Sequence, residues 1–224
     1  VRYGDNPLIT PSIITELFEH LEGSKAAIAA LVFEHEEPNE YGRIILDENG
    51  DFKKIVEFKV ATDLEKKIKL CNSGIMAFAP GVLEKYLLAC VDQSLGYSGK
   101  EFYLTEIISL AIAEGYKVKT IEGDQRVSFG VNNQAELARA TKIIYRQKCQ
   151  QLMEAGVMML DPSHTYIEPT VEVGPGSVIY PNVFLRGSTQ LGSFVVVEPN
   201  SYLSDCKVQD SVQIRASSYL ESCK

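Results

Sequence analysis

The aliphatic residues in the last third of the chain recur at a fixed spacing of six. They are Ile167, Val173, Ile179, Leu185, Leu191, Val197 and Leu203, followed after a slip of one residue by Val208, Ile214 and Leu220. Two residues before each of them stands a small or β-branched side chain. Neither the period of an α-helix nor the period of a flat strand produces this pattern. A fixed short repeat is typical of a solenoid, in which each side of a triangular coil contributes one inward aliphatic residue.

This repeat predicts a coil of about 18 residues, so that the tail forms about three coils stacked roughly 4.8 Å apart. Glycines and prolines such as Gly176, Pro181 and Gly187 fall where the corners must bend. A small β-sandwich with accidental spacing is the alternative. Because a short rod of parallel strands has apolar ends, it needs a cap, a partner or further coils.

The first two thirds of the chain alternate between strand-like and helix-like patterns. Residues 26–33 form a nearly continuous apolar run, which is typical of a strand buried on both faces of a parallel sheet. A turn at Asn49-Gly50 predicts a hairpin of 43–46 with 52–56. Further strands are predicted at 1–5, 71–79 and 117–121, helices at 11–22, 63–69, 81–91, 104–114 and 133–155, and a polar loop at 93–99. This alternation predicts an α/β fold.

We therefore divide the chain into two domains. Residues 1–156 form a Rossmann-like domain with a mixed sheet and end in the connector helix 133–155, with Leu137, Ile144 and Leu152 facing inward. Residues 157–224 form the start of the solenoid. The chain does not begin with methionine, and its first residues read as the end of a strand, so we expect a fragment of a longer polypeptide.

Composition narrows the class of protein further. The formal net charge of −8 argues against a nucleic-acid surface. No apolar run is long enough for a membrane span, and no signal peptide is visible. Five cysteines without a Cys-x-x-Cys motif indicate a reduced, cytoplasmic chain. The histidines His20, His35 and His164 lack metal-ligand spacing.

The first candidate for chemistry is Asp5, at the carboxyl end of the first predicted strand. Ligands bind at this edge of open α/β sheets, and Gly4 would let a ligand approach the backbone. The carboxylate of Asp5 suits Mg²⁺, which prefers oxygen ligands. An aspartate in this position is also common as a helix cap or turn residue.

Several segments read together carry a stronger signal. They are EYGRI at 40–44, IVEFK at 55–59, CNSGI at 71–75, EFYLTE at 101–106 and GVNN at 130–133. With the repeat behind them, they resemble the bacterial N-acetylglucosamine-1-phosphate uridylyltransferases over essentially the whole chain. Members of this family are bifunctional transferases, because their carboxyl-terminal left-handed parallel β-helix also carries a glucosamine-1-phosphate acetyltransferase. Their product serves peptidoglycan and lipopolysaccharide synthesis.

The resemblance assigns roles to individual residues. Asp5 and Asn132 are the catalytic pair that binds Mg²⁺, and Glu57 and Asn72 bind the sugar hydroxyls. All residues implied in substrate binding are Tyr3, Gly4, Asp5, Gly42, Glu57, Asn72, Thr105 and Asn132. Glu57 as a plain surface residue and Asn132 as only the cap of the long helix remain alternatives, and Asn133 is a second candidate for that cap.

The implied reaction joins UTP and N-acetylglucosamine 1-phosphate into UDP-N-acetylglucosamine and pyrophosphate, and hexapeptide proteins of this kind form homotrimers. The family's glycine-rich triphosphate loop and its uracil-binding residues are absent from this sequence, and the repeat stops before the acetyl-transfer residues. We therefore expect little turnover from the chain as given. A sugar-1-phosphate nucleotidyltransferase for another base, and a non-catalytic trimeric or regulatory subunit, remain alternatives.

Overall fold

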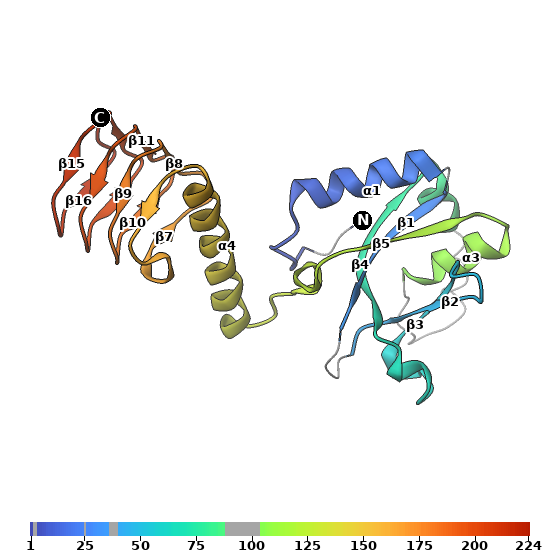
Figure 1. Ribbon diagram of the computed structural model, residues 1–224. Coiled ribbons are helices and arrows are strands. Elements are labelled where there is room, and N and C mark those ends of the chain that lie inside the picture. The colour runs from blue at the N-terminus through green and yellow to red at the C-terminus, as the bar shows by residue number, and fades with distance from the viewer. Residues whose placement is uncertain (2–3, 25, 36–39, 88–103) are drawn as a thin grey trace. The chain divides into compact units, whose positions relative to one another are not determined.

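The computed structural model of the protein describes residues 1, 4–24, 26–35, 40–87 and 104–224. Its contacts divide the chain into two compact units, Val1–Val131 and Asn132–Lys224 (Figure 1). The long helix, which we assigned from sequence to the first domain as a connector, lies in the second unit. None of the helices in the described part of the chain has the length and apolar character of a membrane span.

The first unit is built on a mixed sheet of five strands in the order β3-β2-β4-β1-β5. Strand β1 is parallel to β5 and antiparallel to β4, and β2 is antiparallel to both of its neighbours. The elements are α1 (Pro11–Ser24), β1 (Ile28–Glu34), β2 (Arg43–Leu46), β3 (Phe52–Val56), β4 (Leu70–Phe78), α3 (Glu106–Ala113) and β5 (Val118–Glu122). Residues 82–87 are helical as well.

Alternate residues of β1 enter different cores, one on each face of the sheet. Ile28, Ala30 and Val32 pack in a cluster with residues of α3, whereas Leu31 and Phe33 pack in a cluster with Leu17 and Leu21 of α1. The strand is buried along its length up to Glu34, as its apolar run predicts.

Three details of the sequence analysis are wrong. The helix expected at 63–69 is only a 3-10 turn, Glu65–Lys67, although Thr62 and Glu65 do form a reciprocal capping pair. Gly4 and Asp5 lie in a turn, and Val1 instead exchanges backbone hydrogen bonds with Met76 of β4. Leu137, expected to face inward, is 46% exposed. The loop predicted at 93–99 lies outside the described residues.

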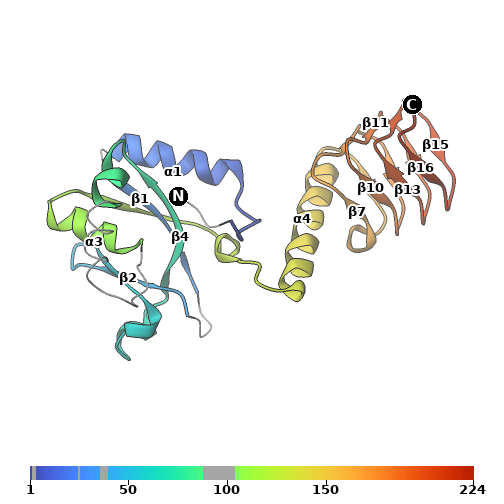
Figure 2. The same cartoon turned by 180° about the vertical axis from the view of Figure 1, so that it is seen from behind.

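The second unit is a solenoid of short parallel strands (Figures 1 and 2). Its three sheets are β16-β13-β10-β7, β14-β11-β8 and β15-β12-β9-β6. The strands are β6 (Met158–Met159), β7 (Tyr166–Ile167), β8 (Glu172–Val173), β9 (Val178–Ile179), β10 (Phe184–Arg186), β11 (Gln190–Leu191), β12 (Val196–Val197), β13 (Tyr202–Ser204), β14 (Lys207–Val208), β15 (Gln213–Ile214) and β16 (Tyr219–Glu221). A short 3-10 turn lies at Pro162–His164 in this unit, and two others, Phe58–Val60 and Gln125–Ser128, lie in the first unit.

The six-residue repeat places its aliphatic residues inside the solenoid. Ile167, Leu185 and Leu203 stack in register, and each is 0% exposed. The solenoid has about four turns rather than the three expected. The difference arises because Met158–Met159, which precedes the first predicted position, already pairs with β9.

The long helix α4 (Gln134–Glu154) packs on the first coil of this solenoid. Cys149 and Leu152 of the helix belong to the same buried cluster as Ile167. The Tyr145 and Tyr166 rings meet edge to face at 6.0 Å. The helix therefore covers the apolar end at which the solenoid begins.

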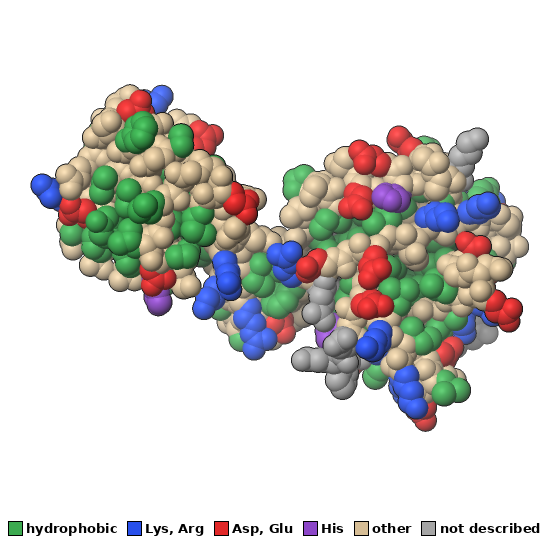
Figure 3. All heavy atoms as spheres, in the orientation of Figure 1, with side chains coloured by type: hydrophobic (Ala, Val, Ile, Leu, Met, Phe, Trp, Pro, Cys, Tyr) green, Lys and Arg blue, Asp and Glu red, His purple; other side chains and the backbone are tan. Residues whose placement is uncertain are grey.

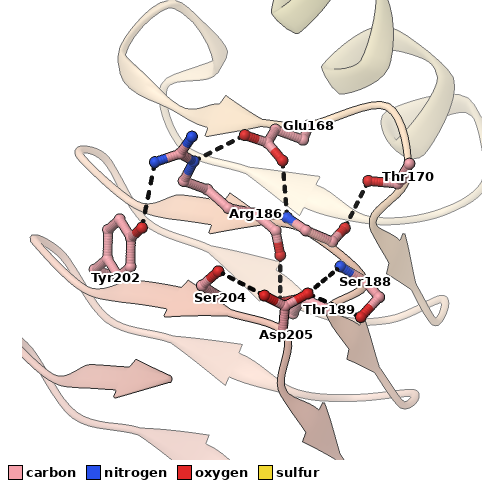
Figure 4. A network of polar contacts seen from close by, with 9 residues as sticks. Glu168, Thr170, Arg186, Ser188, Thr189, Tyr202, Ser204 and Asp205 are labelled. Carbon is pink, nitrogen blue, oxygen red and sulfur yellow. Dashed lines mark hydrogen bonds and ion pairs between the residues drawn. The ribbon is translucent and has the colours of Figure 1, made fainter. Parts of the chain in front are cut away.

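Charged side chains hold one corner of neighbouring coils together (Figure 4). Glu168 accepts hydrogen bonds from the Arg186 Nε and the Gly187 N–H, both at 2.8 Å. Asp205 accepts from the N–H and the hydroxyl of Ser188, both at 2.9 Å. The N–H of Gly187 lowers the pKa of Glu168, and the N–H of Ser188 lowers the pKa of Asp205. These carboxylates replace water as partners of corner backbone groups.

Candidate functional site

The register of β2 brings three predicted residues together in the first unit. Arg43 pairs with Val56 on one side and with Cys71 on the other. Gly42, just before Arg43, therefore lies between the chain segments that carry Glu57 and Asn72. The N–H of Asn72 donates to the carbonyl of Gly42 at 2.8 Å, which ties two of the three segments directly.

Glu57 is held from the other side by Thr105. The Thr105 hydroxyl donates to Oε1 of Glu57 at 2.9 Å, and Thr105 itself is 8% exposed. Thr105 stands at the N-cap of α3, yet its side chain makes no capping bond to that helix. The hydroxyl is thus directed to the carboxylate, which fixes the position of Glu57.

A side chain at position 42 would be crowded by Ile55 and would lie beside the Glu57 carboxylate. A Cβ atom at Gly42 would lie 3.1 Å from Cγ2 of Ile55 and 3.4 Å from Oε2 of Glu57. The first distance is tighter than ordinary van der Waals contact, so the Ile55 side chain would have to shift by a few tenths of an ångström. Gly42 is itself buried, and the missing side chain lets the backbone at 42 lie close to Glu57.

Asn72 lies at an irregularity of the sheet. The pairing of β1 with β4 shifts register between Ala30 and Val32, opposite the segment from Asn72 to Met76. Oδ1 of Asn72 accepts from the N–H of Gly74 at 3.1 Å, and Gly74 has a φ of 78°. Bulges of this kind re-aim side chains near binding sites. Asn72 is 8% exposed, so any ligand would meet an amide already oriented by the backbone.

The segment around Asp5 is anchored separately. The N–H of Val131 donates to the carbonyl of Asp5 at 2.9 Å, and the buried Asn6 donates from Nδ2 to the carbonyl of Val127 at 3.2 Å. Both Gly4 and Asp5 are exposed. Sequence reasoning missed Asn6, because a polar residue after Gly4-Asp5 looks like an ordinary turn residue. Tyr3 lies outside the described residues.

The start of α4 decides which asparagine caps this helix. Asn133 is the N-cap, and its side chain accepts from the N–H of Glu136 at 3.0 Å. The N–H of Asn132 donates to Glu136 at 2.6 Å and lowers the pKa of that carboxyl. Asn132 is therefore not the capping residue. It is the first residue of the second unit, so the meeting of its side chain with that of Asp5 stays a prediction.

The donor atoms present suit a cation that phosphates help to hold. Within the described part of the chain, no group of three or more His, Cys, Asp or Glu side chains could hold a metal ion. One exposed carboxylate, Asp5, and one amide, Asn132, offer hard oxygen ligands. Mg²⁺ at nucleotide sites takes one or two protein ligands of this type and completes its shell with phosphates and water. These two residues therefore fit such an ion by their chemistry.

Comparison with known proteins gives consistent relatives. The chain is 44% identical over 224 residues to the bifunctional protein GlmU of Bdellovibrio bacteriovorus, covering 100% of this chain and 48% of the relative. It is 38% identical over 223 residues to GlmU of Syntrophotalea carbinolica, covering 99% of this chain and 47% of the relative. It is 35% identical over 224 residues to GlmU of Alkaliphilus metalliredigens, covering 99% of this chain and 48% of the relative.

Comparisons with protein-family models and with solved structures do not identify the family. No protein-family model matches the chain. A nucleoside-diphosphate-sugar pyrophosphorylase from Vibrio cholerae aligns with 59% of this chain and 50% of its own at a TM-score of 0.41 and 14% sequence identity, which is too low to support an inference. The chain spans about half the length of the curated relatives it matches, and over its whole length it is homologous to bifunctional GlmU proteins.

Proposed function

We propose that this protein carries the hexosamine-binding half of a uridylyltransferase, which forms UDP-N-acetylglucosamine and pyrophosphate from UTP and N-acetylglucosamine 1-phosphate. The observation that supports it best is that Gly42 lies beside the Glu57 carboxylate and is bonded to Asn72, while the Thr105 hydroxyl donates to that carboxylate at 2.9 Å. These four come from separate segments, and the resemblance implies a substrate-binding role for each of them.

In this proposal, Glu57 and Asn72 bind neighbouring hydroxyls of the sugar. A carboxylate accepts two hydrogen bonds and an amide both donates and accepts, so the pair fits vicinal hydroxyl groups. A sugar that lacks one of these hydroxyls would leave a polar group of the site without a partner, which gives selectivity. The fixed carboxylate reduces the ordering needed when the sugar binds.

Asp5 and Asn132 are proposed to hold Mg²⁺, which when bound would neutralise phosphate charge. The backbone of Asp5 is tied to Val131, the residue before Asn132, which favours this pairing. The protein's own contribution is to orient the sugar phosphate toward the nucleotide. Phosphoryl-group transfer of this type depends mainly on positioning and electrostatic stabilisation.

The test is pyrophosphate release by the full-length protein from N-acetylglucosamine 1-phosphate with UTP, ATP and GTP in turn. Release with UTP alone supports the proposal. Release with ATP or GTP instead would favour a nucleotidyltransferase for another base. No release with any nucleotide would favour a non-catalytic subunit.

We also propose a homotrimer formed through the solenoid, and a cytoplasmic location. Figure 3 shows hydrophobic side chains gathered on the visible face of the solenoid. Phe184, Phe194 and Tyr219 are 39%, 66% and 66% exposed. The cysteines Cys71, Cys149, Cys206 and Cys223 are free thiols, as in a reducing compartment. Sedimentation equilibrium of the full-length protein tests the assembly, and a monomer at micromolar concentration contradicts it.

A further inference from the structure

Arg43 is a buried cation in the middle of the candidate site. It is 3% exposed, although arginine is rarely buried unless its donors are satisfied. Its backbone belongs to β2 and pairs with Val56 of β3 and with Cys71 of β4. Arg43 therefore stands at the crossing point of the three segments that carry Gly42, Glu57 and Asn72.

The guanidinium group of Arg43 contacts all three segments. Nη1 donates to the carbonyl of Tyr41 and lies 3.6 Å from Sγ of Cys71. The guanidinium carbon lies 5.3 Å from the centroid of the Phe58 ring, at cation–π distance. Nε donates to the carbonyl of Lys66 at 3.4 Å, in the 3-10 turn between β3 and β4.

These contacts fall on the chain neighbours of the site residues. Tyr41 precedes Gly42, Phe58 follows Glu57, and Cys71 precedes Asn72. Side chains alternate between the faces of a strand, so Cys71 points away from the face to which Asn72 points. Cys71 indeed packs in the cluster beneath α1, whereas Thr105, the partner of Glu57, stands at the start of α3.

We propose that Arg43 is a positioning residue, whose guanidinium fixes the spacing of Gly42, Glu57 and Asn72 from behind and thereby sets affinity for the hexosamine phosphate. This inference rests on the proposed function for the identity of the ligand. The planar fork of arginine supplies several donors in fixed directions, so one side chain can hold two strands and a turn at once. Lysine offers the same charge without that geometry.

The test compares Arg43→Met and Arg43→Lys with Arg146→Met in the full-length protein. Arg146 is exposed on α4, so the last variant controls for loss of a guanidinium. We expect Arg43→Met to raise the KM for the hexosamine phosphate about 10- to 100-fold with little change in the KM for UTP, because small misplacements of binding groups have effects of this size. Arg43→Lys should recover part of the loss, and Arg146→Met should match the parent.

A second measurement needs no turnover. In the Arg43→Met variant, amide hydrogen exchange should become faster at Asn72, whose N–H donates to the carbonyl of Gly42. Protection of the amides in β1 and β5 should be unchanged. Unaltered exchange at Asn72 in a folded Arg43→Met variant would overturn the inference. So would unchanged KM values for both substrates, even if the variant were less stable or turned over more slowly.

The two proposals fail in different ways. If the parent protein releases no pyrophosphate with UTP, the proposed function fails, and hydrogen exchange alone decides the role of Arg43. If the parent is active and Arg43→Met changes the two KM values equally, the proposed function stands and the positioning role for the hexosamine phosphate is wrong. If Arg43→Met does not fold, Arg43→Lys is used for the same measurements, with smaller changes in the same directions expected.

Discussion

A hydroxyl and a carboxylate from distant parts of the chain define the site at the scale of single residues. Thr105 and Glu57 are separated by 48 residues, and their bond is 2.9 Å long. A side chain at position 42 would be crowded by Ile55 and would lie against this carboxylate. Each of these residues constrains the next, so substitutions here should alter ligand affinity before they alter the fold.

Replacement of Glu57 by glutamine tests the sugar-binding role. Glu57→Gln keeps the shape and an acceptor for Thr105 but loses charge-assisted bonds to hydroxyls. We expect the KM for the hexosamine phosphate to rise about 10- to 100-fold, since a hydrogen bond to a charged group contributes about 1.5–3 kcal/mol. Steady-state kinetics of the full-length protein give the value, with Glu48→Gln in the exposed hairpin turn as control. An unchanged KM would show that Glu57 does not bind the sugar and is an ordinary surface residue.

Asp5 is expected to matter for the metal and not for stability. Asp5→Ala should abolish Mg²⁺-dependent turnover of the full-length protein, because only one carboxylate is available to the ion in the proposed pair. The side chain is exposed, so the free energy of unfolding should change by less than about 0.5 kcal/mol. Asp63→Ala, at a fully exposed carboxylate, is the matched control. A near-normal rate in Asp5→Ala would remove Asp5 from the metal site.

At the scale of elements, the solenoid depends on close approach of its coils. A Cβ atom at Gly174 would lie 2.6 Å from the backbone carbon of Gly192 and the nitrogen of Ser193. The register slip after Leu203 shortens one corner by a residue, and Asp205 turns there with a φ of 54°. The coils of the solenoid can therefore stack only where small residues and polar corner residues occupy these positions.

Gly174→Ala should therefore destabilise the solenoid. We expect a loss of about 1–3 kcal/mol, as is typical of overpacking against rigid neighbours. Gly23→Ala in α1 is the control, because nothing lies within 4 Å of its added carbon and alanine favours helix. Urea unfolding measures both changes. Equal stability of the two variants would show that the coils can separate without cost.

The corner carboxylates predict a loss of solenoid stability in acid. The pKa values of Glu168, Glu198 and Asp205 are lowered, chiefly by backbone N–H groups that bond to their charged forms. Groups with lowered pKa values stabilise the folded state above their ordinary pKa, and this contribution is lost as the pH falls through the lowered value. When the pH is lowered below about 4.5, into the range where free carboxyls titrate, the melting temperature of the solenoid should therefore decrease. A melting temperature constant from pH 6 to pH 3 would contradict this.

At the scale of the whole molecule, the chain consists of two units with cores of their own. The clusters of the first unit and that of the solenoid share no residue among those described. Compact units of this size with separate cores unfold independently as a rule.

We expect two calorimetric transitions for the chain. Leu31→Ala, at a side chain 1% exposed in the first unit, should lower one of them, since such a substitution removes about 2–5 kcal/mol. Gly174→Ala should lower only the other. If each substitution shifts both transitions equally, the units fold as one.

Local sequence patterns predicted much of the secondary structure. The hairpin at 43–46 and 52–56 has the predicted bounds, because Asn49-Gly50 encodes its turn. The long helix begins after Asn133 and ends before Gly156, whose φ is 92°, as its cap signals predict. Thr62 signalled a helix where only a 3-10 turn forms, because a cap does not supply buried contacts for a longer helix.

The sequence by itself determined the period of the solenoid and the segments of the candidate site, because side-chain spacing and turn chemistry act over a few residues. Only the tertiary structure decided that Thr105 holds Glu57, that Asn133 and not Asn132 caps α4, and that Arg43 lies behind three site segments. These facts depend on strand register and on contacts between residues far apart in the chain. Such contacts are selected by burial of the whole core, which no local pattern records.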